Sequence, residues 1–326
     1  MGKKMIVMKA VISNWIPEDA IQYLKEAHFE VFVADSNEPL TYLSELKTAD
    51  AYINRLGLCD ASIIEQCKKL KVIGRTGVGF DNIDIACATR HRIPVVVTPG
   101  TNSRAVAEHT LALLLACAKR LKDMDQGVRQ RNWPIRDAEP PTELEGKTVG
   151  IIGTGAIGKI VAQLCRALGM ECLGYSHSHN RAKVEQAGCV FAESLPELLK
   201  KSDFVTLHVP LLATTQHMIS LPELQMMKPT AFLINTSRGE VVNEADLVKA
   251  LQEGIIAGAG VDVFSQEPVP PEQPLLQAPH LIMTPHCAAL TPESMGASCL
   301  ACAKGCVAVC RGEKWPQVVN PEVYGK

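Results

Sequence analysis

The chain has 326 residues, of which 47% are hydrophobic and 21% charged, proportions typical of a globular protein with roughly two domains. Its formal net charge of −2 excludes a strongly basic surface for nucleic acid or for an anionic membrane. We expect no membrane span and no signal peptide, and therefore a cytoplasmic protein whose twelve cysteines are reduced thiols.

The first hundred residues alternate between strand-like and helix-like segments. Short β-rich runs predict strands at Met5–Ile12, Glu30–Val33, Ala51–Asn54, Val72–Gly74 and Pro94–Val97. Amphipathic patterns predict helices at Pro17–Ala27, Leu40–Lys47, Ala61–Lys68 and Ile83–Arg90. Pro17 suits a first helical position. This alternation with short connections predicts an α/β domain with a doubly wound parallel sheet.

The turn Gly77-Val78-Gly79 follows one of these strands, with Arg75 just before it. Ligands of open α/β sheets bind beyond the carboxyl ends of the strands, and consecutive free N–H groups can hold a carboxylate. The turn is therefore a candidate substrate site, and a plain β-α connection is the alternative interpretation.

A long helix is expected from Ser103, a good N-cap, to about Asp123. Its sequence is apolar nearly all round, which indicates burial on several sides, one of them against a partner subunit. Residues 126–142 are polar and contain proline, as in a linker or surface arm.

The most informative stretch is Gly153-x-Gly155-x-x-Gly158, which follows the apolar run 149–152 and opens a helical pattern. In a dinucleotide-binding turn, the first glycine allows the tight bend and the second lets the backbone approach a pyrophosphate. The third lets the helix pack closely on the strand. The N–H groups at the start of that helix favour an anion.

A second strand, Glu171–Tyr175, should end near the ribose of the bound adenosine, where an NAD site places an acidic residue. This chain has Ser176 there, followed by His177 and Arg181, which can donate hydrogen bonds to a 2′-phosphate. We therefore expect NADP(H) to be favoured, with NAD(H) as the alternative.

Further strands are expected at Phe204–Val209, Ala231–Asn235, Ala257–Val263 and Leu281–Met283, with helices at Glu244–Gln252 and Pro292–Arg311. Three ionisable residues follow successive strands in this part of the chain: Arg238, Glu267 and His286. Together, above a nucleotide-binding turn, they indicate a reaction centre.

The chain resembles the D-isomer-specific 2-hydroxyacid dehydrogenases, close to their phosphoglycerate dehydrogenase-like branch. The similar stretches are residues 72–84, 98–103, 107–110, the Gly153 turn, 208–211, 235–239, 262–268 and 284–286. The resemblance implies a flavodoxin-like substrate domain of residues 1–103 plus 292–326, and a Rossmann domain of residues 104–291. It also implies an active site in the cleft between them and a homodimer.

The resemblance also implies roles for single residues. Arg238, Glu267 and His286 would be catalytic, and substrate would be held by Val78, Gly79, Asn102, Arg238 and His286. Besides Ser176, His177, Arg181 and His286, the cofactor would contact Gly153, Gly155, Ala156, Ile157, Gly158, Val209, Pro210, Thr215, Thr236, Ser237 and Asp262.

This trio suits the reduction of a 2-keto acid. Histidine can supply a proton near neutral pH, a hydrogen-bonded glutamate favours the imidazolium, and arginine offers a planar fork to a carboxylate. Glyoxylate, hydroxypyruvate, a phosphohydroxypyruvate and a sulfonated analogue all fit as substrates. Arg55, Arg75 and Arg136 would meet a second anionic group, or are solvated surface arginines.

Two further points stay open at the level of sequence. Cys299, Cys302, Cys306 and Cys310 fall on one helical face, which favours small buried residues over an iron–sulfur or metal site, and Cys287 next to His286 is a candidate for oxidation. The alternative to an enzyme is a nucleotide-sensing, corepressor-like binding protein on the same fold.

Overall fold

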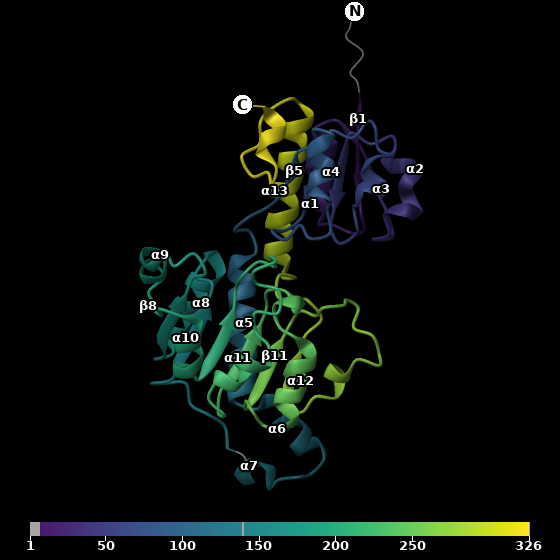
Figure 1. The fold of residues 1–326 in the computed structure, drawn as a ribbon. Coiled ribbons are helices and arrows are strands. Elements are labelled where there is room, and N and C mark those ends of the chain that lie inside the picture. The colour runs from purple at the N-terminus through teal and green to yellow at the C-terminus, as the bar shows by residue number, and fades with distance from the viewer. Residues whose placement is uncertain (1–6, 139, 326) are drawn as a thin grey trace, which may run out of the picture. The chain divides into compact units, whose positions relative to one another are not determined.

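The computed structural model describes residues 7–138 and 140–325. The chain divides into two compact units (Figure 1). Unit 1 comprises Met1–Asn102 and Leu290–Lys326, and unit 2 comprises Ser103–Ala289. The boundaries expected after residue 103 and before residue 292 lie within two residues of these limits.

Unit 1 is built on a parallel sheet in the order β2-β1-β3-β4-β5. Its strands are β1 Met8–Ile12, β2 Phe29–Val33, β3 Ala51–Asn54, β4 Val72–Arg75 and β5 Val95–Val96. Its helices are α1 Glu18–Glu26, α2 Leu43–Leu46, α3 Ala61–Ile64, α4 Ile85–Arg90 and α13 Pro292–Cys310, with 3₁₀ turns at Pro39–Tyr42 and Pro321–Tyr324. The last segment returns to this sheet, because Val318 forms a bridge with Val96.

Several expected boundaries in unit 1 were wrong by a few residues. Pro17 is the extended N-cap of α1 rather than its first helical residue. Asp60 and Asp84 cap α3 and α4 by accepting backbone N–H bonds, so α4 begins at Ile85. The helix expected over residues 40–47 is a 3₁₀ turn followed by α2, since Pro39 starts the tighter turn. The first residues of the strand expected from Met5 lie outside the described part.

The cysteines of α13 are packed into the core of unit 1. Cys299, Cys302 and Cys306 are fully buried, and a Cβ on Gly74 of β4 would lie 2.5 Å from the Sγ atoms of both Cys302 and Cys306. Helix and sheet therefore approach closely only because Gly74 has no side chain. This packing supports the interpretation of these cysteines as small apolar residues.

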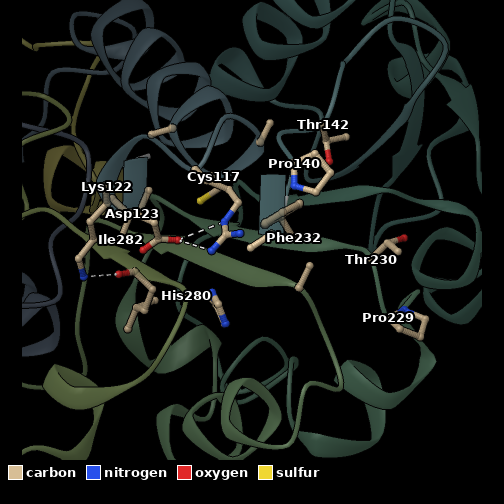
Figure 2. A pocket seen from close by; sticks show the side chains of 16 residues that line it. Cys117, Lys122, Asp123, Pro140, Thr142, Pro229, Thr230, Phe232, His280 and Ile282 are labelled. Atoms are coloured by element: carbon tan, nitrogen blue, oxygen red, sulfur yellow. Dashed lines mark hydrogen bonds and ion pairs between the residues drawn. The ribbon is translucent and has the colours of Figure 1, made fainter. Parts of the chain in front are cut away.

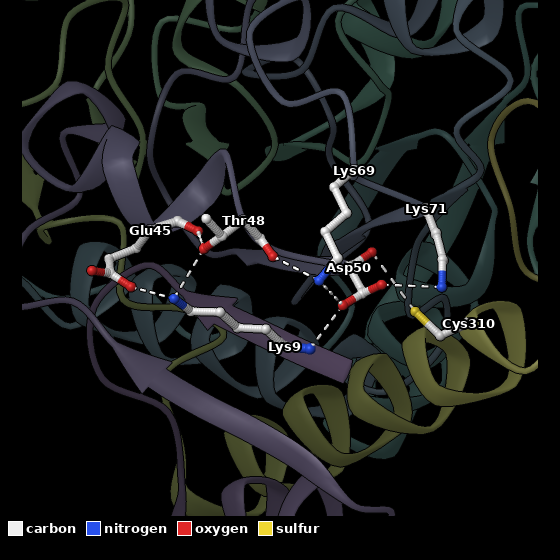
Figure 3. Close-up of polar contacts among 7 residues, drawn as sticks. All are labelled: Lys9, Glu45, Thr48, Asp50, Lys69, Lys71 and Cys310. Carbon is white, nitrogen blue, oxygen red and sulfur yellow. Dashed lines mark hydrogen bonds and ion pairs between the residues drawn. The ribbon is translucent and has the colours of Figure 1, made fainter. Parts of the chain in front are cut away.

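A buried carboxylate organises the amino ends of the strands in unit 1 (Figure 3). Asp50 is 2% exposed and pairs with Lys69 at 2.8 Å and Lys71 at 3.0 Å, while the backbone N–H of Lys9 donates to it. Burial alone would raise the pKa of Asp50, but these bonds outweigh burial and hold that pKa below its usual range. The cluster stabilises the edge of the sheet opposite the loops that can bind ligand.

Unit 2 is built on a longer parallel sheet in the order β12-β11-β10-β9-β6-β7-β8. Its strands are β6 Thr148–Ile152, β7 Glu171–Tyr175, β8 Val190–Phe191, β9 Phe204–Leu207, β10 Phe232–Asn235, β11 Gly258–Val261 and β12 Leu281–Met283. Its helices are α5 Ser103–Ala118, α6 Leu121–Arg129, α7 Ile135–Ala138, α8 Ala156–Ala167, α9 Arg181–Gln186, α10 Leu195–Lys201, α11 Leu221–Met226 and α12 Glu244–Gln252. 3₁₀ turns occupy Gly239–Val241 and Pro274–Gln277. Both units are thus parallel α/β sheets, the expected fold class.

The helix expected from Ser103 to Asp123 is broken. α5 ends at Ala118, Arg120 adopts a left-handed conformation with φ of 52°, and α6 begins at Leu121. A salt bridge of 2.9 Å from Arg120 to Asp123 holds this corner, which sequence alone did not reveal because Arg120 is not glycine. α5 packs against α8, β10 and β11, so most of its apolar surface is used within unit 2.

A cavity of about 470 Å³ lies at the amino ends of the strands of unit 2 (Figure 2). Its lining includes Cys117 of α5, Asp123 of α6, Phe232 of β10 and Ile282 of β12. Ligands of open α/β sheets bind beyond the carboxyl ends of the strands, which is the opposite edge. The cavity is therefore not the site at which the predicted ionisable residues stand.

Candidate active site

The glycine-rich turn of unit 2 has the geometry that its spacing predicts. Gly153 has φ of +94°, and a Cβ there would lie 2.4 Å from the carbonyl oxygen of His208. A Cβ on Gly158 would lie 2.1 Å from the carbonyl oxygen of Gly153, so α8 can pack on the turn only without a side chain. Each of these glycines is required by backbone conformation or by close approach.

The middle of this turn is open and fits a nucleotide pyrophosphate. Gly155 is the N-cap of α8, and a Cβ built on it meets no atom within 4 Å. Ala156, Ile157 and Gly158 form the first turn of α8, whose N–H groups and positive dipole end suit an anion. These are the four residues that the sequence predicts at the phosphates of a dinucleotide, and the prediction agrees with the open space beside Gly155.

The loop after β7 places its polar residues at the surface, but Arg181 is already engaged. Its guanidinium pairs with Glu193 and lies 3.7 Å from Glu185, and it also stacks over the ring of Phe191 at 4.5 Å. Ser176 Oγ lies 3.0 Å from Ser178 Oγ, and His177 is exposed. A phosphate would therefore compete with Glu193 for Arg181.

Other residues expected at the cofactor divide into two groups. Val209 is half-buried and Pro210 is exposed, next to the Gly153 turn. Thr215, Thr236 and Ser237 are buried, and their hydroxyls bond to Pro210, Thr110 and Asn235 respectively. The structure therefore gives the three hydroxyl groups a part in shaping the loops after β9 and β10.

Arg238, Glu267 and His286 are brought together at one edge of the sheet. They follow β10, β11 and β12, which are neighbours in the sheet, so the parallel strands deliver all three side chains to their common carboxyl edge. His286 Nδ1 lies 2.7 Å from Glu267 Oε2, and Glu267 Oε1 accepts the N–H of Phe264 at 3.0 Å. The side chain of His286 is 44% exposed, and its other ring nitrogen has no hydrogen bond among the described residues.

The charges around Glu267 favour its ionised form. Burial alone would raise the pKa of Glu267, but the hydrogen bond and charge of His286, the Phe264 N–H and the charge of Arg238 outweigh it and hold that pKa below its usual range. Arg238 donates to the carbonyl oxygen of Ser237 at 2.7 Å, which orients the guanidinium. The arrangement can hold a proton at His286 next to a cation suited to a carboxylate.

Asp262 supports the loop that carries His286. It is 0% exposed and accepts hydrogen bonds from the Thr284 hydroxyl at 2.5 Å and from the N–H groups of Cys287 and Ala288, each at 2.9 Å. His109 of α5 bonds to Thr284 at 2.9 Å. Sequence reasoning assigned no role to His109 and Thr284, although both stand in motifs it used, because their partners are distant in the chain.

The residues expected to hold substrate in unit 1 lie at or just after the carboxyl ends of β3, β4 and β5. Val78 is exposed, Gly79 and Arg75 are half-buried, and Oδ1 of Asn102 is buried without a hydrogen-bond partner among the described residues. Arg55 donates to the carbonyl oxygen of Trp15 at 3.4 Å, and its guanidinium carbon lies 5.8 Å from the Trp15 ring centroid. Arg55 and Trp15 line a cavity of about 610 Å³ within unit 1.

Arg136, the third arginine considered for a second anionic group, lies elsewhere. It belongs to α7 of unit 2, is exposed and pairs with its neighbour Asp137 at 3.3 Å.

None of the helices among the described residues combines the length and the hydrophobicity that a membrane span requires.

Comparison with known proteins identifies the family. Residues 111–288 match the model of the "D-isomer specific 2-hydroxyacid dehydrogenase, NAD binding domain". The chain is 39% identical to a glyoxylate reductase of Aeropyrum pernix, covering 97% of this chain and 96% of that protein. It is also 39% identical to a D-3-phosphoglycerate dehydrogenase of Methanocaldococcus jannaschii, covering 96% of this chain and 60% of that protein.

A solved relative has the same fold along nearly the whole chain. The structure of D-lactate dehydrogenase from Aquifex aeolicus, complexed with NAD and lactic acid, superposes with a TM-score of 0.84 at 30% identity and covers 95% of this chain and 99% of that one. These relatives are enzymes, so they do not favour the alternative of a nucleotide-sensing binding protein. The chain therefore belongs to the D-isomer-specific 2-hydroxyacid dehydrogenases and is an oxidoreductase of 2-hydroxy and 2-keto acids with a nicotinamide cofactor.

Proposed function

We propose that this enzyme reduces small 2-keto acids of the glyoxylate or hydroxypyruvate type, or of the 3-phosphoglycerate type, with His286 as proton donor. The observation that carries the proposal is the 2.7 Å contact between His286 Nδ1 and Glu267 Oε2. It leaves Nε2 of His286 as the nitrogen that gives its proton to the substrate oxygen. In the reverse direction the same nitrogen is the base.

Each member of the trio has a separate task. When bound, the nicotinamide supplies or accepts the hydride. Glu267 holds the imidazole in one orientation and stabilises its charged form, while Arg238 pairs with the substrate carboxylate and polarises the keto oxygen. Asp262 is a positioning residue, because it holds the backbone that follows His286.

The test is turnover with a panel of 2-keto acids and NADPH or NADH. We expect reduction of glyoxylate or hydroxypyruvate, or oxidation of 3-phosphoglycerate. Absence of turnover with every acid, together with tight dinucleotide binding, would support the binding-protein alternative.

We further propose that Val78, Gly79 and Asn102 of unit 1 hold the substrate and that unit 2 is the nucleotide-binding domain.

Arg55 and Arg75 are proposed to meet a second anionic group on the substrate. The supporting observation is the position of Arg55 and Trp15 in the cavity of unit 1. Arg55→Gln should then raise KM for a phosphorylated acid and leave KM for glyoxylate unchanged, because glyoxylate has no second anion. An equal rise for both acids would contradict this assignment.

Glu267→Gln should move the pH profile. The variant keeps the oxygen that accepts the Phe264 N–H but removes the negative charge that favours a protonated His286. Because the depressed pKa of Glu267 keeps it ionised at neutral pH, the effect is present there and is lost only as pH falls through that pKa. As pH rises, the rate of keto-acid reduction should therefore begin to fall at a lower pH in the variant than in the wild-type enzyme. The measurement is the pH dependence of kcat in buffer that contains a chelator. An unchanged alkaline limb would contradict the pairing.

The proposed cofactor preference is NADP(H). Its support is that the loop after β7 has Ser176 in place of an acidic residue that would repel a 2′-phosphate, with exposed His177 beside it and exposed Arg181 at the start of α9. A charge-assisted hydrogen bond is worth roughly 1.5–3 kcal/mol, hence about one tenfold step in affinity or more. We expect KM for NADPH to be about tenfold below that for NADH.

Two variants test this preference from opposite sides. Ser176→Asp should reverse it, because the carboxylate accepts the ribose hydroxyls and repels the phosphate. Glu193→Gln should strengthen it, because Glu193 competes for the Arg181 guanidinium. A wild-type enzyme that prefers NADH would show that the loop tolerates a 2′-phosphate at most and does not select NADPH.

We propose a homodimer formed through the segment that contains α6. Leu121, Val128 and Trp133 are 55%, 61% and 66% exposed, which is unusual for such large apolar side chains in one short segment. Light scattering should give twice the chain mass of 35.3 kDa, and Trp133→Glu should yield monomers. The control is Val190→Glu, at a 70% exposed site far along the chain, which should leave the dimer intact.

A cytoplasmic location is also proposed, supported by twelve free cysteines.

A further inference from the structure

Three potential metal ligands converge behind the loop of His286. His109 comes from α5, Asp262 follows β11, and Cys287 follows β12. A ring nitrogen of His109, a carboxylate oxygen of Asp262 and the Sγ of Cys287 all lie within 4.8 Å of one another. The separation between His109 Nε2 and Asp262 Oδ1 is 3.4 Å. The group is therefore assembled by tertiary structure from three distant segments of unit 2.

These distances suit a tetrahedral transition-metal ion. Two tetrahedral ligands each about 2.0–2.1 Å from zinc lie about 3.3 Å from one another, which is close to the observed nitrogen–oxygen separation. The sulfur, at most 4.8 Å from the other two atoms, reaches a Zn–S distance of about 2.3 Å by a movement of about 1.4 Å or less. A set of sulfur, nitrogen and oxygen favours zinc, cobalt or cadmium over magnesium or calcium.

The surroundings hold Asp262 in place and leave a path from solvent. The Asp262 side chain is 1% exposed and fixed by the backbone of residues 287 and 288, while the His109 side chain is 21% exposed and Cys287 is half-buried. Another group, Glu65, Cys87 and His91 in unit 1, has two exposed members, whose side chains would lose more rotamer freedom on binding.

We propose that His109, Asp262 and Cys287 form an inhibitory site for a zinc-like divalent ion. On binding, the Cys287 thiol releases its proton to solvent and the thiolate bonds to the metal. The His109 ring binds as the neutral imidazole through Nε2, with its proton on Nδ1. The ion takes the place of the Thr284 hydroxyl between His109 and Asp262, and it draws Cys287 toward α5. His286 is the adjacent residue, so its ring moves away from the geometry needed for proton transfer.

Cobalt binding tests the site without reference to catalysis. Titration of the whole chain with Co²⁺ in thiol-free buffer should give one equivalent of tetrahedral visible bands and a thiolate-to-cobalt charge-transfer band. Cys287→Ser should abolish the charge-transfer band and weaken binding by about tenfold or more, because one of three protein ligands is lost. His109→Gln is the second variant and should weaken binding similarly.

His91→Gln is the matched control, since it removes a ligand of the surface group in unit 1 and should leave the Co²⁺ bands unchanged. In parallel, Zn²⁺ should inhibit turnover of the wild-type enzyme, and adding EDTA should restore it. Inhibition of Cys287→Ser should need a Zn²⁺ concentration at least about tenfold higher. The proposal is overturned if wild type shows no saturable band, if the charge-transfer band persists in Cys287→Ser, or if it disappears in His91→Gln.

Discussion

Replacing His286 by asparagine should lower kcat by a factor of about 100 to 10,000, the usual contribution of a positioned general acid or base. Asparagine cannot hold the proton that Nε2 would give to the keto oxygen, whereas its amide can still contact Glu267. The choice of asparagine matters because His286 has φ of 49°, and asparagine accepts a left-handed conformation better than most residues. The loss should therefore reflect chemistry rather than backbone strain.

His217→Asn is the control for this experiment. His217 is also a histidine of unit 2 with a left-handed backbone, φ of 50°, and it is exposed. The same substitution there should leave kcat and NADPH affinity unchanged, and a fluorescence titration should show that His286→Asn still binds NADPH saturably. Near-normal turnover by His286→Asn would remove His286 from the role of proton donor.

Replacing Arg238 by glutamine should lower kcat/KM by about 100-fold or more. The guanidinium is proposed to give two charge-assisted hydrogen bonds to the substrate, each worth roughly 1.5–3 kcal/mol, and about 1.4 kcal/mol corresponds to a factor of ten. Arg238→Lys keeps the positive charge near Glu267 but loses the planar fork, so we expect it to recover only part of the loss.

The matched control is Arg129→Gln, an exposed arginine on α6 that pairs with Asp125 at 2.7 Å. It removes the same charge from unit 2 and should leave kcat/KM unchanged. Full activity of Arg238→Lys would show that charge alone is sufficient, and full activity of Arg238→Gln would exclude Arg238 from the site.

Sequence by itself determined the features whose causes are local. The strand–turn–helix around Gly153 could be predicted because each glycine answers a requirement of the backbone within a few residues, and the structure has φ of +94° at Gly153. The parallel direction of the strands follows from β-α alternation. Because successive parallel strands end at one edge, the grouping of Arg238, Glu267 and His286 could be inferred before any distance was known.

Only the tertiary structure decided the features that depend on contacts between distant segments. Glu193 contacts Arg181, although no sequence motif relates the two positions. In the same way, Thr284 is bonded to Asp262 and to His109, and Cys287 lies close to both of these residues. The break between α5 and α6 depends on the left-handed conformation of Arg120, which cannot be predicted from the sequence because arginine rarely adopts it. In each case side-chain packing and electrostatics select one arrangement among several that the local sequence permits.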